Sequence, residues 1–225
     1  MTFLKNLPVK YIGELHHIKL INFSVEKSEI EPYLPAGIKI RDYNGRALIS
    51  MVNVDLRKMR PVFFPKALHF SYRHIAFRLL IDDSAYNNGE NKGIYFYRSF
   101  TDKPVIVTGG KILTIYKLDL AQITEAGNTF ELRSGKQYLR YSWENKNPCA
   151  VNEMLQKEVA AVDRAYCPLG KKLKMVEIQR EKWPIEWMCC KNFETTFFTT
   201  ARFEGAFYVK EKIDYQWLPL KNVAL

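Results

Sequence analysis

The stretch from Gly93 to Ile123 constrains the fold most, because it places two apolar, strand-like runs around a Gly-Gly step. Side chains alternate from Ile94 to Ser99, as in a half-buried strand, and Val105-Ile106-Val107 is a β-branched run typical of a strand buried on both faces. Gly109-Gly110 allows a bulge or a close backbone approach. We therefore expect this stretch to form central strands of a β-rich protein.

The segment Lys111–Lys117 alternates with a period of two, which places both terminal lysines on one face of an expected strand with Leu113 and Ile115. Most strand lysines extend to solvent or protect a sheet edge from aggregation. A lysine in an apolar pocket beside a second cation instead has a lowered pKa and can act as a Schiff-base nucleophile. Anion binding without covalent chemistry is the third interpretation, and all three stay open at this point.

The strand expected over Leu68–Ile81 has no purely apolar face, because His74, Arg78 and Tyr72 share one side of it. A polar-lined cavity inside a β-barrel requires such a face. A sheet with a solvent-exposed outer face is the alternative interpretation.

Local signals predict the remaining elements. Helical patterns cover Glu26–Tyr33 and Asn152–Val162, and hairpin turns are expected at Asn44-Gly45 and Ser134-Gly135. The last third of the chain is β-like again, with strands expected over Leu173–Gln179, Trp183–Trp187, Phe193–Phe207 and Tyr208–Ile213.

Composition indicates one globular domain over residues 1–225. The chain has 47% hydrophobic and 14% aromatic residues, which is enough for a core, and it shows no repeat or linker. It also lacks an N-terminal apolar signal region and any uncharged run of about 18 apolar residues. We therefore expect a cytoplasmic protein with no membrane partner.

The formal net charge of +10 is compatible with a nucleic acid, an anionic membrane surface or an anionic substrate. Basic clusters occur only at Arg57–Arg60 and Lys171–Lys174, and neither lies in a nucleic-acid-binding motif. We expect a small anionic ligand and no nucleic acid, and homo-oligomerisation stays open. A basic interaction module using Lys171–Lys174 is an alternative.

The cysteines and histidines give no metal signal. The four cysteines, Cys149, Cys167, Cys189 and Cys190, lack metal-ligand spacing, and vicinal cysteines seldom form a structural disulfide, so four free thiols are expected. Hydrolase, nucleotide-binding and zinc-protease motifs are absent from the sequence. We expect neither a metal nor a cofactor.

Four segments in order, LPAGIKIRDYNGRALISMV, FSYRHIAFRLLI, GIYFYRSFTDKPVIVTGGKILTIYKLDLAQI and AYCPLGKKLKMVEIQREKWPI, resemble the YqjF-like branch of the acetoacetate-decarboxylase-like superfamily. This is a bacterial-type family of unknown function, and the resemblance spans Tyr33 to Trp187. It implies an α+β, β-rich fold: an antiparallel closed or cone-like β-barrel with a few flanking helices and a central cavity.

The resemblance also implies candidate site residues. In acetoacetate decarboxylase, a Gly-Gly-Arg-Glu stretch leads to a Pro-Lys step whose lysine forms the Schiff base. Gly109-Gly110-Lys111 matches the Gly-Gly-Arg part, and an ungapped match places Leu118 at the catalytic lysine with Lys117 one residue earlier. The candidate catalytic residues are therefore Lys117 and Lys111. The candidate ligand-binding residues are His74, Arg78, Tyr72, Arg98 and Tyr116.

Three functions follow from these observations. The first is a cavity protein that binds a small anionic or keto-acid-like ligand without an established reaction. The second is a Schiff-base lyase of the acetoacetate decarboxylase type, either a decarboxylase or an aldolase-like enzyme, with Lys117 as nucleophile and Lys111 as the neighbouring cation. The third is the basic interaction module.

Overall fold

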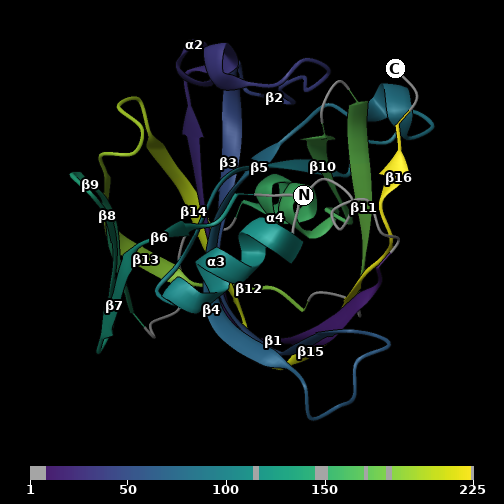
Figure 1. Cartoon of the computed structure of the whole chain (residues 1–225). Helices are drawn as coiled ribbons and strands as arrows, with labels where there is room; N and C mark the ends of the chain where they lie inside the picture. Colours follow the sequence, from purple (N-terminus) through teal and green to yellow (C-terminus); the bar gives the residue numbers. More distant parts are fainter. Residues whose placement is uncertain (1–8, 114–116, 145–151, 170–171, 181–183, 224–225) are drawn as a thin grey trace.

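Seven strands of the chain close into a mixed β-barrel in a computed structural model that describes residues 9–113, 117–144, 152–169, 172–180 and 184–223 (Figure 1). Each strand is hydrogen-bonded to the next around the barrel, and the pairing of β1 with β3 closes it. The strands follow the order β1 (Tyr11–Val25), β15 (Ile213–Trp217), β11 (Lys172–Arg180), β10 (Arg164–Leu169), β5 (Gly93–Thr101), β4 (Phe70–Leu80) and β3 (Arg46–Pro61).

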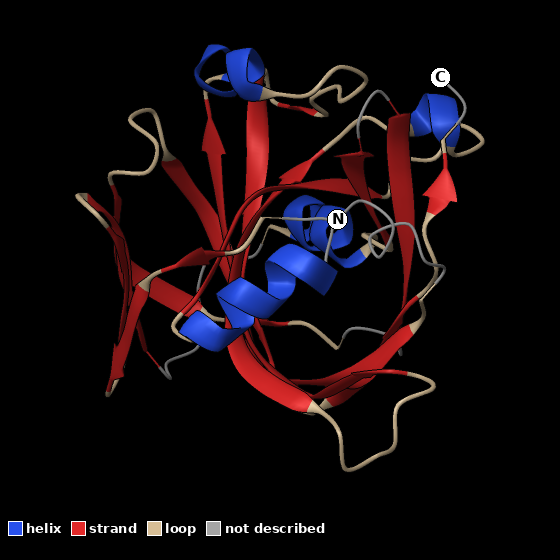
Figure 2. Ribbon diagram, viewed as in Figure 1, coloured by secondary structure: helices blue, strands red, loops and turns tan. Residues whose placement is uncertain are grey.

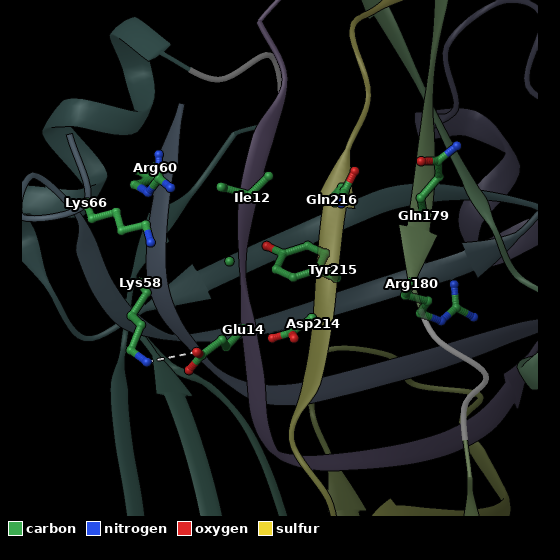
Figure 3. Close-up of a pocket in the computed structure, with 11 residues that line it drawn as sticks. Ile12, Glu14, Lys58, Arg60, Lys66, Gln179, Arg180, Asp214, Tyr215 and Gln216 are labelled. Atoms are coloured by element: carbon green, nitrogen blue, oxygen red, sulfur yellow. Dashed lines mark hydrogen bonds and ion pairs between the residues drawn. The ribbon is translucent and has the colours of Figure 1, made fainter. Parts of the chain in front are cut away.

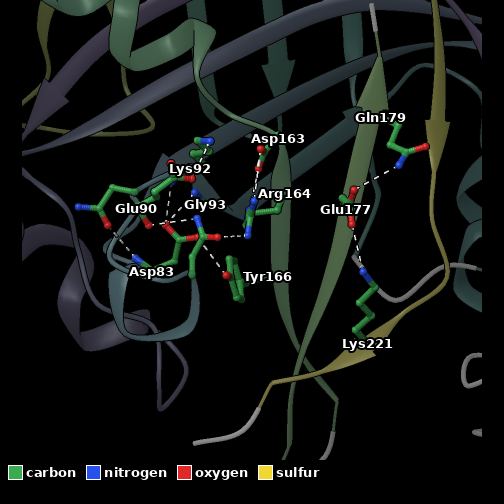
Figure 4. A network of polar contacts seen from close by, with 12 residues as sticks. Asp83, Glu90, Lys92, Gly93, Asp163, Arg164, Tyr166, Glu177, Gln179 and Lys221 are labelled. Atoms are coloured by element: carbon green, nitrogen blue, oxygen red, sulfur yellow. Dashed lines mark hydrogen bonds and ion pairs between the residues drawn. The ribbon is translucent and has the colours of Figure 1, made fainter.

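The expectation of an antiparallel barrel is wrong at one pair, because β5 and β10 run parallel, with Gly93 opposite Arg164. A parallel pair needs a long crossover, and here the chain passes through helices and a second sheet between the two strands. The carboxylate of Asp83 strengthens this junction. It accepts hydrogen bonds from the backbone N–H of Gly93 at 3.0 Å and from the hydroxyl of Tyr166 at 3.0 Å (Figure 4).

Gly93 is required at this junction for steric reasons. A Cβ atom there would lie 2.7 Å from the ring of Tyr166 and 2.8 Å from the carboxyl carbon of Asp83. Strand β5 therefore begins with a glycine because the junction leaves no room for a side chain.

Other strands extend the barrel sheet, and four further strands form a second sheet beside it, on the left in Figure 1. The strands that extend the barrel sheet are β2 (Asp42–Tyr43), β6 (Asp119–Leu120), β12 (Glu186–Trp187), β14 (Arg202–Val209) and β16 (Lys221–Asn222). The second sheet has the order β13 (Cys189–Thr195), β9 (Gln137–Glu144), β8 (Thr129–Ser134) and β7 (Gln122–Ala126).

Helices are a minority of the described chain (Figure 2). The helix predicted over Glu26–Tyr33 is confirmed as α2 (Lys27–Ile30) followed by the 3₁₀ helix η1 (Glu31–Tyr33). The second predicted helix is α4 (Glu153–Ala160), where the Asn152 side chain accepts a hydrogen bond from the Leu155 N–H at 3.1 Å. The remaining helices are the 3₁₀ helix η2 (Ser84–Tyr86) and α3 (Pro104–Leu113).

The strand prediction for Val105–Val107 and Lys111–Lys117 is wrong wherever the structure describes the backbone, because residues 104–113 form α3. A continuous apolar run does not distinguish a buried strand from a helix by its pattern alone. The informative residue is Pro104, which occupies the first helical position and favours a helix start. Val105 is 76% exposed, so it does not lie in a strand that is buried on both faces.

The strand predicted over Phe193–Phe207 is interrupted at residues 196–201. There the backbone N–H groups of Thr199 and Thr200 donate to the carboxylate of Glu29, at 2.6 and 3.1 Å, rather than to a neighbouring strand. Both predicted hairpins are confirmed, β2–β3 around Asn44-Gly45 and β8–β9 around Ser134-Gly135.

Two hydrophobic clusters lie on opposite faces of the barrel wall. On β4, Ala76 and Leu80 belong to the inner cluster with Leu20, whereas Ile75 and Phe77 belong to the outer cluster. The outer cluster also contains residues of the second sheet, including Phe130, Leu132, Leu139 and Tyr141. The second sheet therefore covers the outside of the barrel wall.

No helix among the described residues is long and apolar enough to cross a membrane.

Candidate functional site

A small pocket of about 60 Å³, called the cavity below, is lined mainly by inward-facing residues of the barrel strands. Its polar lining comes from His74 and Arg78 on β4, Arg180 at the end of β11 and Tyr215 on β15. No Asp or Glu lines it within the described part of the chain. The apolar lining consists of Leu15, Val52, Val54, Leu56, Ile94, Phe96, Val162, Ile178 and Trp217.

Strand alternation brings His74 and Arg78 to the inside of the barrel. They share the inner face of β4 with Ala76, and the opposite face packs in the outer cluster through residues such as Phe77. The alternative of a solvent-exposed outer face is therefore wrong for this strand. Tyr72 is buried on the same inner face, with its ring centroid 6.0 Å from that of His74, but it does not line the cavity.

Arg78 is 6% exposed and is held in place by neutral acceptors. Its Nε donates to the carbonyl oxygen of Ser50 at 3.2 Å, and its Nη2 donates to the Ser50 Oγ at 2.8 Å. These two bonds use two of the five N–H donors of a guanidinium and supply no negative charge. Burial lowers the pKa of Arg78 to about 10, still well above neutrality.

Arg180, which is half-buried, provides a second cation to the same cavity. Its Nη2 donates to the carbonyl oxygen of Ala160 at 3.3 Å. Burial, followed by the charge of Arg78, lowers the pKa of Arg180 to about 9, and Asp163 opposes this effect. The two guanidinium groups therefore remain charged at neutral pH and repel each other in a poorly solvated space.

His74 is neutral at pH 7, because burial and the charge of Arg78 lower its pKa to about 4. The ring lies between the rings of Tyr72 and Phe96, with centroid distances of 6.0 and 6.3 Å. A neutral imidazole has one N–H donor and one acceptor nitrogen, so it can contact the polar part of a ligand without adding charge.

A wider, open pocket of about 690 Å³ adjoins this cavity (Figure 3). Arg180 and Tyr215 line both spaces and therefore mark the boundary between them. On the solvent side, Lys58, Lys66 and Glu14 line the open pocket, and the Lys58 Nζ lies 2.8 Å from the Glu14 Oε1.

The structure does not place Lys117 in the barrel cavity. Its side chain is 84% exposed, and its Nζ lies 3.2 Å from the Asp119 Oδ1. It lines a separate open pocket together with Arg98. The expectation that Lys117 shares a cavity with His74 and Arg78 is wrong because Leu118, which is 5% exposed, takes the inward position in the inner cluster.

The other predicted site residues either lie away from the cavity or fall outside the residues that the structure describes. The Arg98 Nη1 donates to the Gln137 Oε1 at 2.6 Å, and the guanidinium lies 4.9 Å from the ring centroid of Phe100, which belongs to the outer cluster. The side chain of Lys111 and the whole of Tyr116 lie outside the described residues.

The sequence prediction missed Arg180. It follows Val176 and Ile178 at intervals of two on β11, and these positions share one face of a strand. That alternation was the available signal, because it places a charged side chain on a face that is otherwise apolar and inward.

The cysteine prediction is wrong for Cys189, which is disulfide-bonded, whereas Cys167 and Cys190 are free thiols. Disulfides are rare in reducing compartments, so the cysteines do not support a cytoplasmic location. No group of three or more His, Cys, Asp or Glu side chains in the described ranges is arranged to hold a metal ion.

Three solved structures share the fold. They are acetoacetate decarboxylase from Legionella pneumophila (12% identity, TM-score 0.62, covering 96% of this chain and 87% of that one), an acetoacetate decarboxylase-like enzyme from Sphingomonas wittichii RW1 (11%, 0.60, 97% and 94%) and the enduracididine biosynthesis enzyme MppR (9%, 0.53, 96% and 89%). At these identities the likeness concerns the fold alone.

No curated protein matches the sequence. Residues 13–215, however, match the family DUF2071, an uncharacterized conserved protein. This match covers most of the chain. The chain therefore belongs to the DUF2071 family of uncharacterised proteins and shares its fold with acetoacetate decarboxylase-like enzymes.

Proposed function

We propose that the protein binds a small carboxylate of the 2-keto acid class inside the barrel, with Arg78 and Arg180 neutralising its charge. The observation that carries this proposal is that buried Arg78 and half-buried Arg180 line one cavity, whose described lining contains no Asp or Glu. Two like charges that lie close together in a poorly solvated space repel each other. A bound anion removes this repulsion and accepts hydrogen bonds from both arginines.

The size of the cavity supports a small ligand. A buried water needs roughly 10–15 Å³ of such volume, so the cavity of about 60 Å³ has space for about five waters. That space suits a molecule of about six non-hydrogen atoms. Val52, Phe96 and Ile178 supply an apolar wall for an alkyl group, and His74 supplies a neutral polar contact for a keto oxygen.

Pyruvate is the first ligand to test. The structure of the enduracididine biosynthesis enzyme that shares this fold is a complex with the condensation product of pyruvate and imidazole 4-carboxaldehyde. Pyruvate also combines the carboxylate, the keto oxygen and the short alkyl group that the lining favours.

A Schiff-base lyase with Lys117 as nucleophile has weaker support. A lysine of that kind requires burial and a neighbouring cation. Lys117 is exposed and lies beside the carboxylate of Asp119, while the inward position belongs to Leu118. We therefore place binding ahead of covalent chemistry.

The test is a titration of the protein with pyruvate, acetate and chloride, followed by thermal unfolding and calorimetry. Pyruvate should raise the melting temperature of the wild type and of the control Arg133→Met, whose arginine is 48% exposed on the second sheet. Arg78→Met and Arg180→Met should lose this response. An equal response in all four proteins, or none in the wild type at millimolar pyruvate, would reject the proposal.

A further inference from the structure

The loop between β3 and β4 presents a cluster of apolar side chains to solvent. Val62, Phe63, Phe64 and Leu68 are 49%, 67%, 43% and 60% exposed, and they make up four of the nine large exposed apolar residues in the described chain. The loop projects from the lower edge of the barrel in Figure 1. Such a concentration is unusual, since exposed apolar residues are normally scattered.

Internal hydrogen bonds hold this apolar loop in one conformation. The Arg60 Nη1 donates to the carbonyl oxygens of Val62 and Phe64 at 3.1 and 2.7 Å. The Phe64 N–H donates to the Pro61 oxygen at 3.0 Å, and the Phe63 and Phe64 rings meet edge to face with centroids 5.2 Å apart. The aromatic side chains are therefore presented to solvent in an ordered arrangement.

Basic residues surround the apolar loop. The sequence has no Asp or Glu from Leu56 to Ile81, whereas Arg57, Lys58 and Lys66 flank the apolar positions. Arg57 and Lys58 are 45% and 64% exposed, and each lies near one carboxylate, at 3.7 Å from Asp55 and 2.8 Å from Glu14. Lys66 is exposed as well. The loop thus combines an apolar tip with a positively charged base.

We propose that residues 57–68 dock the protein on the surface of a lipid bilayer containing anionic lipids. Phe63, Phe64 and Leu68 would enter the boundary between headgroups and acyl chains, and the lysines and arginine would contact the anionic headgroups. The expectation of no membrane partner was based on the lack of a spanning segment. Peripheral docking does not need one, so it is compatible with that observation.

Charge favours a bilayer over a second copy of the chain. A symmetric dimer through this loop would bring two sets of Arg57, Lys58 and Lys66 together, and like charges at an interface are unfavourable. An anionic bilayer offers both the apolar layer and the opposite charge. Lys58, Arg60 and Lys66 also line the open pocket, so docking would turn this pocket toward the membrane (Figure 3).

Vesicle sedimentation tests this proposal. The wild type should bind phosphatidylcholine vesicles that contain phosphatidylserine, and binding should weaken with rising salt. Replacing both rings by Phe63→Ser and Phe64→Ser should weaken binding about tenfold or more, and Lys66→Gln should weaken it about fivefold. The matched controls Val105→Ser and Lys136→Gln change an exposed apolar and an exposed basic residue elsewhere, and they should bind like the wild type.

The changed side chains are exposed, so thermal unfolding should confirm that every variant is folded. Absence of binding to the anionic vesicles, or unchanged binding by the double serine variant, overturns the proposal. Light scattering supplies another decisive result. A wild-type dimer that becomes monomeric in the double serine variant would assign the loop to self-association and overturn membrane docking.

Discussion

The imidazole of His74 has a pKa of about 4 in the folded protein instead of 6.5, so it links stability to pH. Between these values the unfolded chain binds more protons than the folded one, and stability falls as the pH falls. The loss between pH 7 and pH 5 should be about 2 kcal/mol. Urea unfolding at both pH values measures it. In His74→Gln this part of the pH dependence should disappear, and an identical slope in the two proteins would contradict the assignment.

Arg180 should destabilise the ligand-free protein, because it places a second positive charge beside Arg78 in a poorly solvated cavity. Replacing one of two neighbouring like charges with an apolar side chain of similar length removes their repulsion and the desolvation of the replaced charge. We expect Arg180→Met to raise the free energy of unfolding by about 1 kcal/mol in a buffer without small carboxylates. Arg133→Met is the control. A less stable Arg180→Met protein would show that Arg180 has a purely structural role.

Lys117 should not form a Schiff base, and the protein should not decarboxylate acetoacetate at an enzymatic rate. A Schiff-base lysine needs a pKa about 3 to 4 units below the ordinary value, which corresponds to about 4–5 kcal/mol of destabilisation of the ammonium. Burial supplies that effect, and the Lys117 side chain is 84% exposed. Borohydride treatment with acetoacetate, followed by mass spectrometry, checks this. A reduced adduct that is lost in Lys117→Ala would overturn it.

At the scale of elements, we predict unequal effects on stability for the truncation of two apolar residues, one on β4 and one on α3. Phe77 on β4 is fully buried, and its ring centroid lies 5.6 Å from that of Phe100 and 5.1 Å from that of Phe197. Phe77→Ala should therefore lower the free energy of unfolding by about 3–5 kcal/mol. Val105→Ala on α3 should change it by less than about 0.5 kcal/mol, because Val105 is exposed.

Denaturant unfolding of both variants also tests the secondary structure. A strand buried on both faces at residues 105–107 would make Val105→Ala costly, since deleting buried methyl groups leaves a cavity. If Val105→Ala lowers the free energy of unfolding by more than about 1 kcal/mol, the result would contradict the exposed helix and favour the buried strand instead.

At the scale of the whole molecule, closure of the barrel depends on the junction between β5 and β10. The buried Asp83 carboxylate accepts hydrogen bonds from the N–H groups of Lys92 and Gly93 and from the Tyr166 hydroxyl. Asp83→Ala leaves all three donors without this acceptor and should lower the free energy of unfolding by about 3 kcal/mol. Tyr166→Phe removes one of these hydrogen bonds and should lower the free energy of unfolding by about 1 kcal/mol. Equal losses in the two variants, measured by urea unfolding, would refute this role for the carboxylate.

Features that depend on neighbours in the chain were readable from the sequence. Asn44 and Gly45 both adopt positive φ angles, 51° and 78°, and this local requirement predicted the first hairpin correctly. The alternation in β4 likewise placed His74 and Arg78 on one face. These signals involve a few adjacent residues, so no tertiary contact is needed to read them.

The tertiary structure alone decided how distant segments combine. Arg78 and Arg180 lie far apart in the sequence and meet because β4 and β11 belong to one closed barrel. The same closure gives the inward position to Leu118 and leaves Lys117 in solvent. Residues 105–107 became helical although their β-branched side chains favour a strand, since the burial of an element depends on what packs against it and not on its own propensity.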